Sequence, residues 1–405
     1  METAQPDQQA IVAFAEDLLS SRFGGTQKLS DVEALTGSGH AVVLRARVAN
    51  SPFLPHRSVV IKHNPATGYA VDDAAFLREI VAYQFTNSLA ADVRPGPVLL
   101  AHDVDKRTVV LTDSGNTDTF AEALESADED VRRTLLRSLG AELGQMHAGT
   151  ADREQDYDLL LSRMLKKHPE YAENQVMRDK ALYDSIYRGV TIAEAAGLAV
   201  PEEVKALADQ AAKSLQSGRY RAFTPFDLSP DNIIVADNIH FLDYEWAGFR
   251  NVGFDVACVI AGFPQFLFAQ PVSDAEADVF IEAWAREVNG LWPQFKDAGQ
   301  IQHLVTACLV GWAFSSLTTM SAGGVEVLAA VLRGHEEIPL GPEQSLLRTA
   351  EHGPFSDDEL LIRRDLFETF EALSRFANRC EDGDCQPAAD FGAVLAQRLR
   401  EPGQR

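Results

Sequence analysis

The chain has 405 residues, 46% hydrophobic and 24% charged, so it is long enough for two lobes with a sizeable shared interface. Its 36 Lys and Arg residues are outnumbered by 60 Asp and Glu residues, giving a net charge of -24. Because this charge repels polyanions, it argues against nucleic acids and anionic membrane surfaces as partners.

Targeting and cysteine patterns predict a cytoplasmic protein without structural disulfides. The N-terminal residues place no basic segment ahead of a short apolar stretch, so we expect no signal peptide. The most apolar later stretch, 304–314, falls short of the roughly 20 residues of a membrane helix and predicts a buried helix. The four cysteines match no zinc-site spacing and are expected to be free thiols: Cys258, Cys308, Cys380 and Cys385.

The first 115 residues predict a small sheet with two helices. Apolar residues recur at helical spacing over 8–21, ahead of the Gly24-Gly25 break, and a second helical pattern covers about 72–89. Runs rich in β-branched residues predict strands at 41–48, 58–63, 98–103 and 108–112. We therefore expect an N-terminal lobe over 1–115.

Long helical patterns dominate from residue 118 onward, including 128–147, 176–196 and 201–217. One β-hairpin interrupts them, with strands at 233–235 and 239–242 around an Asp-Asn turn. We expect a mainly helical lobe over 116–376, a peripheral tail over 377–405, and an α+β fold overall.

Polar side chains gather at the open end of this hairpin. Pairing around the turn sets Asn232 opposite Leu242, so Asn232 and Asp243 should emerge side by side. Asp227 lies on the loop that enters the same end. The sequence therefore predicts three oxygen-bearing side chains in one place.

These side chains suit phosphate chemistry with a metal ion. Asn232 and Asp243 offer the oxygen ligands that Mg²⁺ prefers, and nucleotide phosphates would complete the shell. Asp227, set apart from the metal, could accept the proton of an attacking hydroxyl. Asp and Asn beside Pro are also common turn residues, but the order of Asp, Asn, hairpin and second Asp favours the functional interpretation.

The run Phe-Asp-Leu-Ser-Pro-Asp-Asn-Ile-Ile-Val, followed by Phe-Leu-Asp-Tyr-Glu, resembles the signature of the aminoglycoside phosphotransferase and choline kinase family. The resemblance implies a bilobal protein-kinase-like fold, ATP and Mg²⁺ as cofactors, and a kinase with an alcohol group as acceptor. It also implies a catalytic base at Asp227, magnesium ligands at Asn232 and Asp243, and a structural carboxylate at Asp255. His147, at the end of a helix resembling one of the family's, is interpreted as structural.

The N-terminal lobe offers the lysine and glutamate that such a kinase requires. Lys62 ends an apolar strand, and Glu79 shares one face of the next helix with Phe76 and Tyr83. Taken singly, such residues are more often a lysine that reaches water and a surface glutamate. As a pair in this order they predict an ion pair that positions the lysine for phosphates.

Two further segments resemble the family's nucleotide contacts. Gly37, Ser38 and Gly39 could form a turn whose amides approach the phosphates, although such a triplet is more often a plain hairpin turn. Thr112 and Ser114 fall where an edge strand and hinge would receive the adenine ring through backbone hydrogen bonds.

The catalytic loop departs from the family pattern. The family usually has a histidine two residues before the catalytic Asp, and this chain has Pro225 there, with Phe226 in place of a small residue. Since that histidine is thought to brace the loop, its loss concerns loop geometry more than chemistry. Proline fixes φ and could stiffen the loop by another route.

The acceptor and two alternative functions stay open at this point. Asp231, Glu245 and Trp246 could contact a small cationic or sugar-like acceptor by charge and stacking, and each is equally explained as local structure. Amino sugars, aminoglycosides, choline-like amines and plain sugars all fit. The alternatives are a nucleotide-binding regulator without phosphotransfer and a metal-dependent hydrolase.

Overall fold

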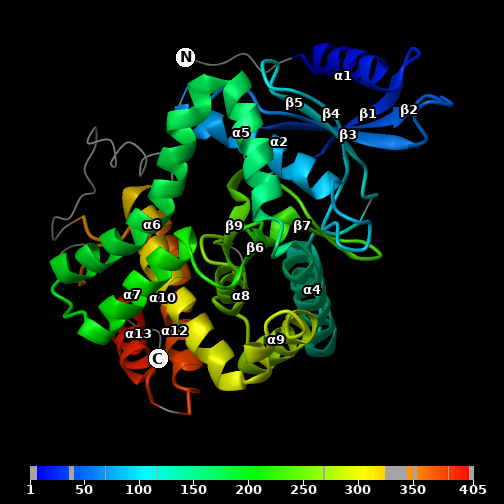
Figure 1. The fold of residues 1–405 in the computed structure, drawn as a ribbon. Helices are drawn as coiled ribbons and strands as arrows, with labels where there is room; N and C mark the ends of the chain where they lie inside the picture. Colours follow the sequence, from blue (N-terminus) through cyan, green and yellow to red (C-terminus); the bar gives the residue numbers. More distant parts are fainter. Residues whose placement is uncertain are drawn as a thin grey trace.

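The computed structural model describes residues 7–35, 41–68, 70–115, 117–267, 270–323, 344–349, 354–381 and 383–400. A small sheet with a helix on its outer face lies at one end, and helices make up most of the rest (Figure 1). This is the α+β arrangement predicted from the sequence. The boundary expected at residues 115 and 116 stays a prediction.

The sheet is antiparallel throughout, with strand order β1-β2-β3-β5-β4. The predicted segment 108–112 is therefore an interior strand rather than an edge strand, because β4 adds beyond it. The first strand was not predicted. The bounds are β1 Leu29–Leu35, β2 Val42–Val48, β3 Ser58–His63, β4 Leu99–Asp103 and β5 Thr108–Thr112.

Strand alternation gives the sheet two different faces. In β3, Val59 and Ile61 belong to the apolar cluster beneath α1 (Gln8–Phe23), whose Ala15 and Leu19 are fully buried. Lys62 therefore points to the opposite face, toward the helical part of the molecule. The same alternation in β2 sends Leu44 to α1 and its neighbours to the other face.

The predicted helix between the strands is α2 (Ala70–Asn87), which packs into the main core rather than into the cluster under α1. It lies beneath the sheet and contacts α5, α6 and the turn after Asp243 (Figure 1). Among the described residues, the α-helices of the C-terminal part are α3 Phe120–Ser126, α4 Glu129–Thr150, α5 Glu154–Lys167, α6 Ala172–Ala195, α7 Glu202–Gln216, α8 Gly253–Ile260, α9 Asp274–Val288, α10 Ala298–Ala322, α12 Asp357–Ala377 and α13 Gln386–Leu399.

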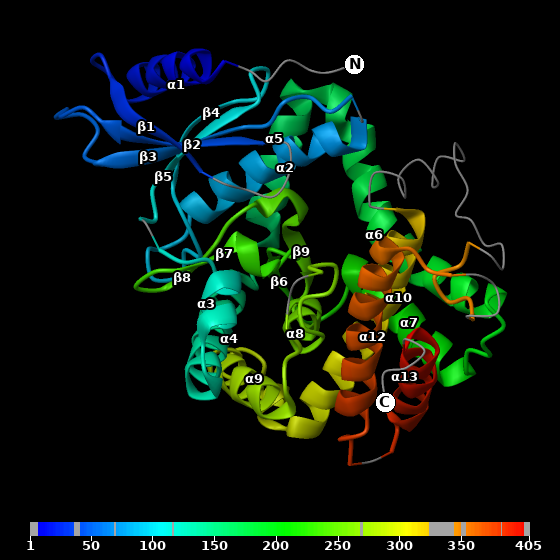
Figure 2. The same ribbon diagram turned by 180° about the vertical axis from the view of Figure 1, so that it is seen from behind.

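Helix α10 is the central helix of this part and packs on α6, α7, α8 and α12 (Figure 2). It is the one described helix long and apolar enough to cross a membrane by length and composition, yet 83% of its apolar window is buried inside the protein. The prediction of a buried helix around 304–314 is thus confirmed.

Two short strand pairs hold the loops of interest. The predicted hairpin is present as β7 (Ile233–Val235) and β8 (Ile239–Phe241), in the predicted register. A second pair, β6 (Arg221–Thr224) with β9 (Gly248–Asn251), was not predicted. Because β6 and β9 enclose the segment between them, they fix both ends of the 225–247 region.

The C-terminal segment is less peripheral than expected. Helix α13 packs along α12 and contacts α7, and its Phe391 and Leu395 are buried in the main core. Cys385 is also buried, whereas Cys380 is half-buried. One face of α13 (Gln386–Leu399) is apolar, which explains why the helix packs on the core instead of lying free.

Candidate active site

Lys62 lies between two carboxylates from different parts of the chain. Its Nζ is 2.8 Å from Oε1 of Glu79 and 2.7 Å from Oδ1 of Asp243. Lys62 lies on β3 and Glu79 on α2, and Asp243 is the second residue after β8 (Ile239–Phe241). The expected Lys62–Glu79 ion pair is therefore present, and Asp243 joins it from the hairpin.

The hairpin and its entry loop bring Asp227 and Asn232 together. Nδ2 of Asn232 donates to Oδ2 of Asp227 at 3.4 Å, and the Ser229 amide donates to Oδ1 of Asp227 at 3.0 Å. The Leu242 amide donates to the Asn232 carbonyl at 2.8 Å, so the pairing beyond β7 and β8 is as predicted. Asp243 adopts a left-handed backbone with φ 56°, which turns the chain away from the strand direction.

A cavity of about 510 Å³ lies between the sheet and the hairpin, and Asp227 is not among the residues that line it. Its polar lining includes Lys62, Glu79, Asn232 and Asp243. Both residues predicted for the hinge, Thr112 and Ser114, also line it. The Ser114 hydroxyl is hydrogen-bonded to His240 Nδ1 at 3.0 Å. Its apolar walls include Val43, Val60, Pro97, Leu111, Ile234 and Leu242. The predicted Gly37, Ser38 and Gly39 turn lies outside the described residues.

Arg45 and Asp113 are charged residues of the cavity that the sequence analysis missed. Arg45 of β2 forms an ion pair with Asp113 at 3.0 Å and donates to the Gly115 carbonyl at 2.7 Å. This contact ties the sheet to the segment after β5. Alternation along β2 placed Arg45 on the cavity side, but its partner could be identified only from the fold.

The carboxylates of the site outnumber its lysine, so an additional positive charge would be stabilised there. Burial opposes the charge of Lys62, but Asp243 and then Glu79 outweigh it and raise the pKa of Lys62. Burial, helped by the neighbouring charges of Asp243 and Asp231, raises the pKa of the Asp227 carboxyl to about 6. A carboxylate with this pKa is ionised at neutral pH and can accept a proton.

The residues present fit a magnesium ion only in part. No cluster of three or more His, Cys, Asp or Glu side chains with metal-binding geometry occurs among the described residues. The amide and carboxylate oxygens of Asn232 and Asp243 at one hairpin end are nevertheless the donor type that Mg²⁺ prefers. A cation here would therefore take its remaining ligands from phosphates and water.

The residues expected near an acceptor separate into two groups. Asp231 lines the cavity beside Asn232. Glu245 and Trp246 are not among the cavity residues and face α6, where the Arg178 guanidinium lies 3.7 Å from the centroid of the Trp246 ring and donates to the Glu245 carbonyl at 2.8 Å. Burial, then Asp243, raises the pKa of the Glu245 carboxyl to about 8.

Asp255 and His147 form a fully buried pair behind the catalytic loop. The Trp284 indole, which can only donate, donates to His147 Nδ1 at 3.0 Å. His147 Nε2 must then carry the ring proton and donates to Oδ2 of Asp255 at 3.2 Å. The pair therefore links α4, α8 and α9, which present His147, Asp255 and Trp284.

One family model and several solved structures are similar to this chain. The model of the phosphotransferase enzyme family matches residues 56–296, and no curated protein sequence matches the chain. Among solved structures, choline kinase from Cryptosporidium parvum Iowa II is 9% identical, with 96% of this chain and 99% of that chain covered and a TM-score of 0.47. Choline kinase LicA from Streptococcus pneumoniae is 13% identical, with 90% and 98% covered and a TM-score of 0.46. The streptomycin–ATP complex of APH(2")-IIa is 10% identical, with 81% and 97% covered and a TM-score of 0.41.

The family match is the finding that decides identity. It spans more than half of the chain and includes Lys62, Glu79 and the whole segment from Asp227 to Asp255. The protein-kinase-like fold implied by the sequence resemblance is thereby confirmed. This chain belongs to the phosphotransferase enzyme family and is a small-molecule kinase.

Proposed function

We propose that the chain transfers the γ-phosphoryl group of ATP to a hydroxyl of a small cationic or sugar-like acceptor. The observation that supports this most is a single cavity with Lys62 on its sheet wall and Asn232 and Asp243 on its hairpin wall. Asp227 lies next to that wall, within hydrogen-bonding reach of Asn232.

Each residue has a distinct part in this proposal. Lys62, held by Glu79, supplies a fixed positive charge for the phosphates. Asn232 and Asp243 would hold Mg²⁺, which when bound neutralises charge that develops on the phosphate oxygens. Asp243 also contacts Lys62, so the carboxylate that would hold the cation lies next to the lysine that would face the phosphates. Asp227 orients the acceptor hydroxyl and takes its proton.

The acceptor side is supported by charge more than by shape. Asp227, Asp231 and Asp243 concentrate negative charge beside the cavity, which favours an acceptor with an amino group or many hydroxyls. Trp246 contributes less than expected to cation binding, because Arg178 already covers its ring.

A second candidate is a nucleotide-binding regulator without phosphotransfer. It is favoured by the catalytic loop, where Phe226 adopts φ 66° directly before Asp227. A bulky residue in this region is unfavourable, so the loop geometry needs support from elsewhere in the fold.

The test is nucleotide-dependent thermal stabilisation with and without Mg²⁺, for the native chain and for Asp243→Ala. Asp237→Ala is the matched control, because Asp237 is an exposed turn residue of the same hairpin. We expect a magnesium-dependent shift that is lost in Asp243→Ala and kept in Asp237→Ala.

An acceptor screen for ADP release then separates the two candidates. Release that depends on an amine or sugar acceptor supports the kinase. A nucleotide shift with no ADP release from any acceptor supports the regulator. No shift with any nucleotide would contradict both.

A further inference from the structure

Phe226 has a backbone conformation that its side chain does not favour. Its φ is 66°, in the left-handed region that glycine enters readily and bulky residues rarely adopt. It directly precedes Asp227, and Pro225 before it is buried. The direction in which Asp227 leaves the loop therefore depends on whatever holds Phe226 in this conformation.

The Phe226 ring is held on several sides, with only 7% of the residue exposed. It stacks on Trp312, with ring centroids 5.1 Å apart and planes 26° apart, and lies 5.8 Å from Phe254. The guanidinium of Arg250 lies 4.8 Å from the ring centroid. A cation this close to an aromatic ring in a desolvated place is an attractive contact.

Arg250 is itself fixed at two points. Its Nη1 donates to the Trp246 carbonyl at 2.6 Å, and its Nη2 is 3.4 Å from Oδ1 of Asp179 on α6. Asp179 is also held by Arg78, at 2.9 Å through two separate hydrogen bonds. Arg250 therefore joins three segments: the turn that follows Asp243, helix α6, and the catalytic loop.

We propose that Arg250 is a positioning residue, which acts through the ring of Phe226 to hold the catalytic loop and so fixes the place of Asp227. The family's usual histidine braces this loop, and this chain has Pro225 in its place. The contact between Arg250 and Phe226 braces the loop here instead. The kinetic part of this proposal rests on the proposed function, because it needs Asp227 to act as the base.

A second solvent-accessible cavity makes a matched control available. It measures about 350 Å³, is lined by α5, α6, β6 and β9, and has both Arg250 and Arg221 in its wall. Arg221 forms an ion pair with Glu154 at 2.6 Å and donates to the Phe249 carbonyl at 2.6 Å. Its ion pair and its hydrogen bonds lie away from the catalytic loop, so Arg221→Gln removes an arginine charge from the same cavity wall without touching Phe226.

The experiment compares Arg250→Gln, Phe226→Leu, their double variant and Arg221→Gln, with Arg250→Lys as a conservative variant in case Arg250→Gln does not fold. The first readout is hydrogen–deuterium exchange of the 223–232 peptide, which needs no turnover. The second is the turnover number, measured beside the nucleotide-dependent thermal shift.

We expect faster exchange of the 223–232 peptide in Arg250→Gln and Phe226→Leu, and unchanged exchange in Arg221→Gln. Turnover should fall roughly 10- to 100-fold in both loop variants while the nucleotide shift is kept, since misplacement of a reacting group costs rate more than binding. The double variant should be no slower than the slower single variant, because both substitutions remove one interaction. Arg250→Lys should recover part of the turnover.

Two outcomes would overturn the proposal. One is unchanged exchange in a folded Arg250 variant, and the other is single effects that multiply in the double variant. If the native chain transfers no phosphoryl group, the kinetic readout fails with the proposed function, and the exchange of the peptide alone decides whether Arg250 braces the loop.

Discussion

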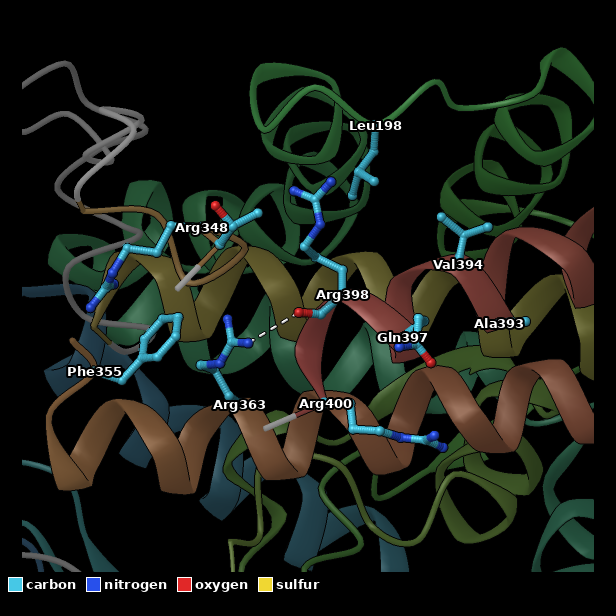
Figure 3. Close-up of a pocket in the computed structure, with 10 residues that line it drawn as sticks. Leu198, Arg348, Phe355, Arg363, Ala393, Val394, Gln397, Arg398 and Arg400 are labelled. Carbon is cyan, nitrogen blue, oxygen red and sulfur yellow. Dashed lines mark hydrogen bonds between the residues drawn. The ribbon is translucent and has the colours of Figure 1, made fainter. Parts of the chain in front are cut away.

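The cavity between sheet and hairpin can be compared with a larger one, of about 600 Å³, formed among α12, α13 and the segment after α6 (Figure 3). Four arginines line the larger cavity: Arg348, Arg363, Arg398 and Arg400. In a chain with a net charge of -24 this concentration of positive charge invites an anion site. The contacts of these side chains argue otherwise.

Arginines of the larger cavity bind backbone carbonyls and a carboxylate at the ends of helices and loops. Arg363 donates to the carbonyls of Arg398 and Leu399 at 3.1 and 3.2 Å, where α13 ends. Arg348 forms an ion pair with Glu359 at 2.6 Å. Figure 3 shows the guanidinium groups of Arg348, Arg398 and Arg400 pointing away from one another.

The smaller cavity is arranged in the opposite way. Lys62, Asp243 and Glu79 point at one another from separate elements, and the neighbouring Asp227 has its pKa raised to about 6 by burial and by Asp243. The comparison indicates that charged residues mark a binding site when their side chains point at one another and their charges do not cancel. Cavity size and the number of charges do not identify it.

The largest effect that tests this comparison is expected from Asp227→Asn. The substitution keeps the size of the side chain but removes the proton acceptor, so turnover should fall by roughly 10²–10⁴-fold with nucleotide affinity largely intact. Because burial disfavours the Asp227 charge, the thermal midpoint should stay equal or rise. Steady-state kinetics and thermal unfolding measure both.

Asp237→Asn at the hairpin turn is the control for Asp227→Asn, since it changes the same group at an exposed position. It should leave turnover and stability as they are. An Asp227→Asn protein with native turnover would remove Asp227 from the mechanism.

Arg363→Met tests the other cavity. Arg363 is 2% exposed and donates to the carbonyls of Leu346, Arg398 and Leu399, so its loss leaves buried acceptors unmet. Urea unfolding should show a loss of roughly 2–4 kcal/mol, given about 1–3 kcal/mol for each unmet buried group. The nucleotide-dependent shift should be unchanged.

Arg400→Met is the matched control within the same cavity, because Arg400 is exposed and lies 5.6 Å from the Phe367 ring. It should change stability little. If Arg363→Met unfolded like the native chain but altered binding of phosphate or nucleotide, the structural interpretation of this cavity would be wrong.

The parts of the site that could be predicted are those set by local pattern. The hairpin register follows from a short turn between two apolar runs, and it fixes Asn232 beside Asp243. The helical spacing around Glu79 placed it on a partly buried face, and the order of strand-end lysine and helix glutamate predicted its ion pair with Lys62. Their roles in catalysis stay predictions.

The parts that escaped prediction depend on contacts between distant segments. Strands β6 and β9 are four residues each and are recognisable only once they pair. The contact of Arg250 with Phe226 and that of Arg45 with Asp113 likewise join residues that no local pattern relates. The packing of α13 on α12 was missed because a short amphipathic pattern does not indicate which element the helix packs against.

The smallest effect is expected from Glu245→Gln, which sharpens the comparison at the edge of the active site. Burial and Asp243 raise the pKa of Glu245 to about 8, so the folded protein holds this proton while the unfolded chain releases it near pH 4.5. Between these values the folded state binds more protons, and the native chain loses stability as pH rises.

The glutamine variant lacks this loss of stability. Its advantage in thermal midpoint should therefore grow from pH 6 to pH 8, to roughly 1–3 °C, and then level off. The exposed Glu203→Gln should show no such trend, and an advantage that stays constant from pH 6 to pH 8 would mean that Glu245 is already ionised in the folded protein.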